Sequence, residues 1–337
     1  MQDTSRTPGA ATVGGIRKAT GIFLFGAAAV GMMTFGAVGA DARMDNSVYG
    51  LTDAGELVAF DPASPATLNA TVPVTGDASG DTILGMDFRP ATGELYAIGA
   101  SSTVYTVDPA TGAATTVGAT DPAIEGSVLG FDFNPTADAI RVVTDAGQNL
   151  RLTDLDSELG TTVDGTLAYS EDDENAGGQP AVVGAGYTNN VPDAEDTMLY
   201  DLDLATGNLV QQDANPGVLT TVGSVGVPFT ASTGFDVSPD GAAYAALQPG
   251  EGQASSLYTV DLDSGAASEV GTIGGGLVIT GFAIPAGDAM MADDDDGATT
   301  ALPDTGGASA TAVAAVGLLA AGAATMLVLR IRRPDAR

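Results

Sequence analysis

A glycine-containing segment recurs five times in this chain, and its spacing limits the folds that the chain can adopt. Each copy is a short run of β-branched and aromatic residues, as in ILGMDFRP and VLGFDFNP, which is typical of a strand. A repeat of about 50 residues that holds four strands has the length of one propeller blade. The sequence therefore predicts an all-β propeller with five blades. The shared glycines, at spacings of 45, 54, 50 and 47 residues, are Gly85, Gly130, Gly184, Gly234 and Gly281.

A second recurring segment predicts hairpins inside the blades. It reads YTVDPATG from Tyr105, YDLDLATG from Tyr200 and YTVDLDSG from Tyr258. In each copy a strand ends in Asp, and a glycine that tolerates positive φ ends the turn. We expect the next strand to pair directly with the first.

The two ends of the repeat region complement each other. Three expected strands, 48–53, 56–61 and 70–76, lack a first member, whereas the last repeat, ITGFAI, lacks the other three. Pairing them completes one blade from both ends and leaves no open sheet edge. Six blades remain possible if the acidic insert around Glu171–Glu174 hides a strand. The alternative fold is a β-sandwich or a two-domain β protein, which regular repeats disfavour.

The composition excludes several functions. The 337 residues carry a net charge of −32 and contain no Cys, His or Trp. Such acidity repels phosphate backbones, so we expect no nucleic-acid partner. Without His or Cys there is no His-based triad, no His-ligated zinc and no thiol nucleophile. Carboxylate chemistry and hard-cation binding remain, and the acidity alone is also explained by adaptation to salt.

The N-terminus has the pattern of a secretion signal. Arg17 and Lys18 precede the uncharged run 19–40, and small residues follow up to Ala42. A basic start, an apolar middle and a small-residue exit are the three parts of a signal peptide, which we place at residues 1–42. The alternative is an uncleaved membrane anchor.

The C-terminus combines a motif, an apolar span and a basic tail. Residues 311–329 carry no charge and would cover roughly 28 Å as a helix, close to one membrane core. Arg330, Arg332 and Arg333 follow. This arrangement resembles the sorting signal of sortase-anchored Gram-positive surface proteins. The motif before the span is Leu302, Pro303, Asp304, Thr305 and Gly306.

The resemblance implies that sortase cleaves between Thr305 and Gly306 and links the Thr305 carbonyl to peptidoglycan. The expected membrane contact is the C-terminal helix before sorting. The alternative is a surface protein retained in the plasma membrane, on its extracellular side, by an uncleaved helix. The expected division of the chain is a signal peptide (1–42), a propeller-like domain (43–285), an acidic linker (286–301) and a sorting signal (302–337).

The third repeat, GFDFNPTADAIRVVTDAGQNLRL, resembles a bacterial secreted family of unknown function. The likeness extends over about residues 48–284 and implies a propeller-like domain without a known activity. The pattern of that family commonly has Arg after the Asp at position 138, where this chain has Ala139. The residues that match the pattern are Asp132, Asn134, Pro135, Asp138, Arg141, Gly147, Gln148, Asn149 and Arg151.

Charged residues at the predicted axis form the candidate site. Asp87, Asp132 and Asp236 occupy equivalent places in three inner strands, and Arg141 and Arg151 follow in the third repeat. These groups either bind a ligand in the channel or pair with one another between blades. The full candidate cluster is Asp87, Asp132, Asn134, Arg141, Gln148, Asn149, Arg151 and Asp236.

Three functions agree with these observations. The first is a cell-wall-anchored binding or scaffold module with an unknown extracellular ligand. The second is a hydrolase or lyase that uses the channel carboxylates and Ca²⁺, the one cofactor that the composition suggests. The third is a surface protein with no specific ligand. We expect no catalytic residue under the first and third.

Overall fold

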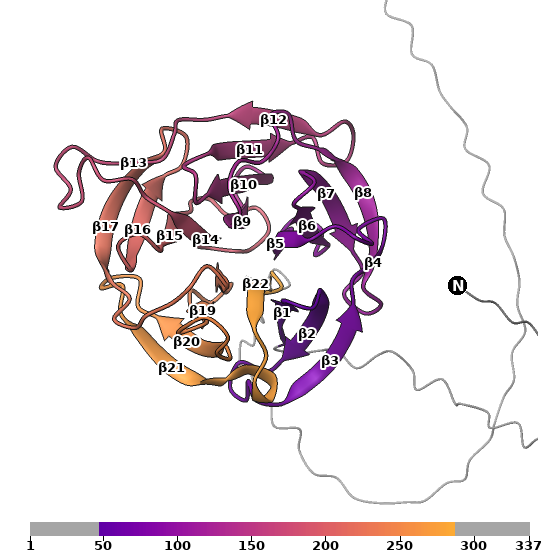
Figure 1. Cartoon of the computed structure of the whole chain (residues 1–337). Coiled ribbons are helices and arrows are strands. Elements are labelled where there is room, and N and C mark those ends of the chain that lie inside the picture. The colour runs from indigo at the N-terminus through magenta and orange to yellow at the C-terminus, as the bar shows by residue number, and fades with distance from the viewer. Residues whose placement is uncertain (1–46, 287–337) are drawn as a thin grey trace, which may run out of the picture. The chain divides into compact units, whose positions relative to one another are not determined.

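The computed structural model describes residues 47–286 and folds them into five sheets around one axis, as Figure 1 shows. Blade 1 contains, from the axis outward, β22 (Ile279–Ala283), β1 (Val48–Thr52), β2 (Glu56–Phe60) and β3 (Leu68–Pro73). Blade 2 contains β5 (Ile83–Phe88), β6 (Leu95–Gly99), β7 (Thr103–Val107), β8 (Ala113–Ala119) and, at its rim, β4 (Thr75–Gly76).

The other three blades follow in chain order. Blade 3 contains β9 (Leu129–Asn134), β10 (Ala139–Thr144), β11 (Asn149–Thr153) and β12 (Gly160–Val163). Blade 4 contains β14 (Val182–Tyr187), β15 (Leu199–Asp203), β16 (Asn208–Asp213), β17 (Val218–Ser224) and, at its rim, β13 (Ala168–Tyr169). Blade 5 contains β18 (Thr233–Val237), β19 (Ala243–Leu247), β20 (Ser256–Val260) and β21 (Ala267–Thr272).

Blade 1 closes the ring with strands from both ends of the described region, as predicted. β1 pairs antiparallel with β22, with Tyr49 opposite Ala283 and Leu51 opposite Gly281. The five-blade prediction is therefore confirmed, and so is the all-β class, because the only helical turn among residues 47–286 is the short 3-10 segment Ile273–Gly275.

Two details differ from the sequence-based expectation. The run 70–76 is not one strand, since β3 ends at Pro73 and β4 leaves blade 1 to pair in parallel with β8 of blade 2. The segment that follows blade 3 likewise contributes β13 to the rim of blade 4, beside β17. The acidic insert therefore adds no sixth blade, and these two short strands instead link neighbouring blades.

The predicted hairpins form, and their glycines have positive φ: 73° at Gly112, 70° at Gly207 and 80° at Gly265. The Asp before each turn accepts a backbone N–H from inside it, as Asp108 does from Ala110 at 2.8 Å. In blade 4, however, the motif follows the second strand, β15, whereas in blades 2 and 5 it follows the third. The motif therefore specifies a tight turn but does not specify which two strands of the blade the turn connects.

Buried apolar side chains fill the spaces between the blades. Each of five clusters draws residues from two neighbouring blades. Aromatic pairs cross two of these boundaries: Tyr49 and Phe88 have ring centroids 5.2 Å apart, and Tyr96 and Phe133 have centroids 5.3 Å apart. Burial at the blade boundaries therefore supplies the main driving force that holds the ring together.

The shared glycines allow the inner strands to approach one another. A Cβ on Gly130 would lie 2.5 Å from the Cβ of Ala185 in the next blade, and one on Gly85 would lie 2.7 Å from the Cβ of Phe131. Gly281 is different, because its nearest neighbour would be 3.5 Å away. Close approach explains the recurring glycine at most positions of the ring.

Several expectations lie outside the described residues: the signal peptide at 1–42, the sorting motif at 302–306 and the C-terminal membrane helix. Between residues 47 and 286, no helix has the length and apolar character needed to cross a membrane.

Candidate functional site

Three aspartates meet at the axis, as their equivalent positions predict. Asp87, Asp132 and Asp236 lie on the inner strands β5, β9 and β18 and are buried. Each offers a carboxylate oxygen that lies within 4.8 Å of the corresponding oxygens of the other two. Blades 4 and 1 have Gly186 and Ala283 at the equivalent positions, two residues after the shared glycine. The cluster therefore contains three acids and not five.

Each axial acid ties its own blade to the next. Asp87 Oδ2 accepts the backbone N–H of Phe133 at 2.8 Å, and Asp132 Oδ1 accepts that of Tyr187 at 2.9 Å. Asp236 Oδ2 accepts the N–H of Ile284 at 2.6 Å. These acceptors satisfy buried N–H groups that have lost their contact with water.

The two blades without an axial acid change this pattern. Asp87 lies in blade 2 and Asp236 in blade 5, and the blade before each of them, blade 1 or blade 4, has no axial acid. The N–H groups of Phe88 and Val237 therefore receive no acceptor from the preceding blade. The aspartate directly before each of these residues accepts the N–H instead. Asp87 Oδ1 lies 2.7 Å from Phe88 N, and Asp236 Oδ1 lies 2.5 Å from Val237 N. Five of the six carboxylate oxygens therefore accept a backbone N–H.

Burial raises the pKa of Asp87 and of Asp132 well above the usual range of an aspartate, and neighbouring aspartates raise both further. Burial also raises the pKa of Asp236, to about 7, although N–H bonds from Ile284 and Val237 and a bond with Asp132 act in the opposite direction. The cluster therefore holds protons at mildly acidic pH. Carboxylate oxygens at this separation are also the ligands that hard cations prefer, so these three residues are the ones that could hold Ca²⁺.

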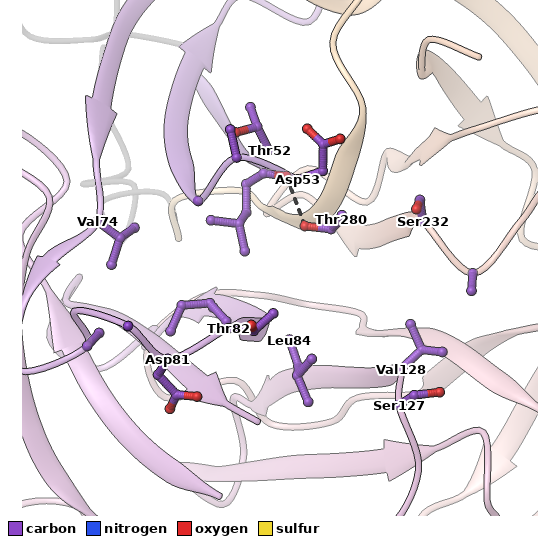
Figure 2. A pocket seen from close by; sticks show the side chains of 17 residues that line it. Thr52, Asp53, Val74, Asp81, Thr82, Leu84, Ser127, Val128, Ser232 and Thr280 are labelled. Carbon is purple, nitrogen blue, oxygen red and sulfur yellow. Dashed lines mark hydrogen bonds between the residues drawn. The ribbon is translucent and has the colours of Figure 1, made fainter. Parts of the chain in front are cut away.

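The channel narrows above these acids. At the ring of shared glycines the cavity is only 20 Å³, room for about one water molecule. Toward the start of the inner strands it widens into a hollow of 540 Å³, which we call the axial mouth and which is seen in Figure 2. The axial mouth is lined by residues that include Thr52, Asp53, Asp81, Thr82, Ser127, Ser232 and Thr280.

The axial mouth has a mixed polar and apolar lining without a basic residue. Its lining comes from blades 1, 2, 3 and 5 and contains hydroxyl groups and two carboxylates but no Lys, Arg or aromatic residue. Asp81 is occupied, since it accepts from the Ser101 hydroxyl and from Tyr105 Oη at 2.9 Å. Asp53 is exposed. Thr280 donates to the carbonyl of Leu51 at 3.4 Å, the bond drawn in Figure 2.

The candidate arginines are not in the axial cluster. Arg141 Nη1 donates to Asn149 Oδ1 and to Asp164 Oδ2, both at 2.7 Å, and Nη2 donates to Asn215 Oδ1 at 3.0 Å. Arg151 reaches the other oxygen of Asp164 at 3.4 Å. The structure thus brings Arg141, Arg151 and Asn149 together at the boundary between blades 3 and 4. No ion pair joins them to the axial acids within residues 47–286.

The other two candidates hold loops. Asn134 Oδ1 accepts from the N–H and hydroxyl of Thr136 in the turn after β9. Gln148 accepts the N–H of Glu125 and donates to the carbonyl of Ala123, both at 2.9 Å. The candidate cluster therefore separates into an axial group, a group between blades and two loop contacts.

One difference among the second strands of the blades was not predicted from the sequence. Opposite the axial position, blades 1, 2, 4 and 5 carry Tyr49, Tyr96, Tyr200 and Tyr244, whereas blade 3 carries Arg141. The signal was present, since LYAIG, LYDLD and AYAAL align with IRVVT, which places Arg141 opposite the tyrosines. Without the register, the aligned tyrosines read only as ordinary strand residues.

A buried acid without a partner lies at the same boundary. Asp201 on β15 is fully buried, and neither of its carboxylate oxygens has a hydrogen-bond partner. Burial raises the pKa of Asp201 well above its usual range, while the charge of Arg141 lowers it and that of Asp203 raises it. This environment favours the neutral form of the Asp201 carboxyl, because an unpaired buried carboxylate is costly.

Comparison with known families assigns two parts of the chain. The model of the Domain of unknown function (DUF4394) matches residues 56–283. The chain belongs to the DUF4394 family. The LPXTG cell wall anchor motif matches residues 294–334, so the DUF4394 domain is carried by a protein that is exported, processed by sortase and attached to the cell wall. No curated protein matches the chain.

Solved structures similar to this one include three of low identity. A protein from Lactobacillus plantarum has 18% identity over 70% of each chain, with a TM-score of 0.36. A protein of unknown function from Bacteroides thetaiotaomicron has 17% identity over 66% of this chain and 57% of that one, with a TM-score of 0.43. Hydrazine synthase from Kuenenia stuttgartiensis has 14% identity over 57% of this chain and 49% of that one, with a TM-score of 0.36.

Proposed function

We propose that the DUF4394 domain is a non-catalytic binding module that presents its axial mouth at the cell wall. The observation that carries this proposal is the lining of the mouth, which combines hydroxyl groups from four blades and an exposed carboxylate, Asp53, with apolar residues and contains no basic residue. Such a surface accepts hydrogen bonds from polar or cationic groups and repels anions. The ligand class is therefore a neutral or cationic polar component of the wall.

The absence of aromatic residues from this lining narrows the ligand further. Sugar rings are commonly held by stacking on aromatic faces, and the mouth offers none. Hydrogen bonding to hydroxyl or amino groups is the remaining means of recognition. We therefore favour the peptide part of the wall polymer over its glycan strands.

Binding of peptidoglycan fragments to the axial mouth can be tested with the full chain in a non-ionic detergent. The probe is the soluble material released from purified walls by muramidase, and the measurement is isothermal titration calorimetry. Asp53→Lys places a cation in the mouth and is expected to weaken binding about tenfold. Asp263→Lys makes the same change in a turn of blade 5 and serves as the control. Equal effects of the two variants would leave only general charge attraction and overturn the proposal.

We also propose that sortase cleaves the bond between Thr305 and Gly306. The Thr305–Gly306 peptide bond breaks, and the Thr305 carbonyl forms an amide with an amino group of the wall peptide. Mass spectrometry of muramidase-released protein should find Thr305 as the last residue, linked to wall peptide. A Thr305→Ala variant should be absent from the cell-wall fraction and present in the membrane fraction. A wall-linked residue other than Thr305 would contradict this site.

The enzyme alternative rests on the three axial acids, and their geometry supports it less well. Five of their six oxygens accept backbone N–H groups, and the 20 Å³ constriction separates them from the axial mouth. A substrate at the mouth would therefore not reach these carboxylates. Peptidoglycan fragments recovered unchanged after long incubation would favour the binding module, and new fragments would favour the enzyme.

A further inference from the structure

The strand from which the chain leaves the ring is also the strand that closes the ring. β22 (Ile279–Ala283) is the innermost strand of blade 1, and within residues 47–286 it pairs with no other strand than β1 (Figure 1). From Ala286 the chain continues toward the cell-wall anchor motif, which matches residues 294–334. Tension between the wall and the domain therefore enters the fold at the end of β22.

The two ends of β22 lie at opposite ends of blade 1. Thr280, near the start of β22, lines the axial mouth together with Thr52 and Asp53 at the end of β1, and Figure 2 shows these three residues close together. Ala283, the last residue of β22, pairs with Tyr49 near the start of β1. Both ends of the described region therefore leave blade 1 at the end of its strands that is remote from the axial mouth.

Two buried residues of blade 5 hold β22 near its two ends. Just before and at its start, the Ser255 N–H donates to the carbonyl of Leu277 at 2.8 Å, and Ser255 Oγ accepts the N–H of Ile279 at 3.0 Å. Just after its end, Asp236 accepts the N–H of Ile284 at 2.6 Å. Ser255 and Asp236 are completely buried, so water does not compete for these hydrogen bonds.

The side chains of β22 are part of the core between blades 1 and 5. Ile279 and Phe282 belong to the apolar cluster that these two blades share, and the rings of Phe60 and Phe282 have centroids 6.3 Å apart. Withdrawal of β22 would expose this cluster, open the ring and remove Thr280 from the axial mouth. Both the closure of the ring and the shape of the mouth therefore depend on β22.

The direction of a load decides how strongly β22 resists it. In an antiparallel pair the hydrogen bonds lie perpendicular to the strands. A pull between the axial mouth and Ala286 acts along β22, so all of its bonds to β1 are loaded in shear at the same time. A pull between the two ends of the described region acts across the pair instead, and it breaks the bonds one after another from Tyr49 and Ala283 onward.

We propose that the domain is a tension-bearing link, in which β22 carries a load along its own direction between the axial mouth and the cell-wall anchor. The shear arrangement and the hydrogen bonds to Ser255 and Asp236 keep the strand in place, so the mouth keeps its shape under load. This inference rests on the function proposed for the axial mouth, because a ligand held there supplies the opposing force. The test below needs no ligand, so its failure and the failure of ligand binding are distinguishable.

The test is single-molecule pulling on the full chain in non-ionic detergent at constant force. The chain contains no Cys, so two introduced cysteines are the only attachment points for the handles. Asp53→Cys with Ala286→Cys applies the force along β22, whereas Asn46→Cys with Ala286→Cys applies it across the pair of β22 and β1. At equal force we expect the first double variant to stay folded at least about tenfold longer, because forced unfolding is governed by the unfolding rate.

Further variants, made with the handles at positions 53 and 286, test whether β22 is the strand that carries the load. Asp236→Ala removes the acceptor of the Ile284 N–H and should shorten the folded lifetime about tenfold. Asp236→Asn keeps an acceptor oxygen and should largely preserve the lifetime. Asp87→Ala makes the same change between blades 2 and 3, away from β22, and should shorten it much less. The proposal is overturned if the two handle arrangements give equal lifetimes, or if Asp87→Ala shortens the lifetime as much as Asp236→Ala does.

Discussion

Asp87 on β5 accepts a hydrogen bond from the backbone N–H of Phe133 on β9, with 2.8 Å between the nitrogen and the carboxylate oxygen. The bond crosses a blade boundary, and Asp132 and Asp236 repeat it at two other boundaries. The axial acids therefore act first as acceptors that join neighbouring inner strands. Their effects on stability can be separated from any role in binding.

Asp132→Ala should destabilise the propeller, whereas Asp132→Asn should not. Alanine leaves the buried N–H of Tyr187 without an acceptor, at a cost of about 1–3 kcal/mol in the free energy of unfolding. Asparagine keeps one acceptor oxygen and replaces a carboxyl next to Asp87 and Asp236 with a neutral group. We expect Asp132→Asn to be at least as stable as the unmodified chain at pH 8. Denaturant titration of the full chain in detergent checks both values.

The control for this pair is Asp53→Ala, at an exposed acid of the axial mouth. It should change the free energy of unfolding by less than about 0.5 kcal/mol. If Asp132→Asn lost as much stability as Asp132→Ala, a charged carboxylate and not merely an acceptor would be required at the axis, and our interpretation of the cluster would be wrong.

Stability should fall as the pH rises from about 4 to 7. Burial raises the pKa of Asp236 to about 7 in the folded protein, while the unfolded chain keeps an ordinary value near 3.9. The folded state therefore retains a proton that the unfolded state has lost, and this contribution is complete below pH 4 and disappears as pH passes 7. Each such carboxyl contributes a slope of roughly 1 kcal/mol per pH unit.

Thermal or denaturant unfolding across this pH range measures the slope. Asp236→Asn removes one of the raised groups and should make the slope shallower, whatever its effect on stability at a single pH. Asp53→Asn, which removes an exposed charge, should leave the slope nearly unchanged. Equal slopes for the unmodified chain and Asp236→Asn would show that general repulsion among surface carboxylates causes the pH dependence.

Gly130→Ala and Gly281→Ala form a matched pair at equivalent positions of two inner strands. The new Cβ of the first would lie 2.5 Å from Ala185 Cβ, where no atom fits without movement of the strands. That of the second would have its nearest neighbour at 3.5 Å, an ordinary contact. We expect a loss of about 1–3 kcal/mol for Gly130→Ala and little change for Gly281→Ala. If the two variants shifted the melting temperature equally, close approach of neighbouring inner strands would not be the reason for glycine at position 130.

The blade number and the closure of the ring could be predicted because both depend on local repeats. The five glycine-containing segments are the five inner strands. The last of them, ITGFAI, has no further strands after it, and the first three strands have no inner strand before them, so the two sets complete one blade. The rim strands β4 and β13 could not be predicted in this way. Each is two residues long and exists only because another blade offers an edge to pair with, which no local pattern records.

The candidate site was predictable only in part. Asp87, Asp132 and Asp236 have the same place in the repeat, and this alone predicts that they lie together at the axis, as they do. For Arg141 the sequence left two alternatives, a place at the axis or ion pairing between blades. Its register partner Asp132 lies beside it on the sheet, but its guanidinium pairs with Asp164. The direction of a long side chain depends on the partners that the next blade supplies.

Arg141→Leu should cost far more stability than Arg151→Leu. The side chain of Arg141 is 3% exposed and holds Asp164, Asn149 and Asn215, so its removal leaves the half-buried Asp164 carboxylate with fewer partners. We expect a loss of about 3 kcal/mol. Arg151 is 36% exposed, and its contact with Asp164 is longer, at 3.4 Å, so about 1 kcal/mol or less is expected. Denaturant titration of the two variants makes the comparison, and equal losses would contradict it.

Calcium should stabilise the protein no more than sodium at matched ionic strength. Five of the six oxygens of the axial acids accept backbone N–H groups, and burial raises the pKa of all three acids, so a cation would have to displace protons from a closed site. Both salts should still raise the melting temperature, because they screen repulsion in a chain of net charge −32. Melting curves of the full chain in CaCl₂ and NaCl measure this. A larger shift with CaCl₂ at low concentration that Asp132→Asn removes would instead establish a metal site at the axis, since ligand binding to the folded state raises stability by mass action.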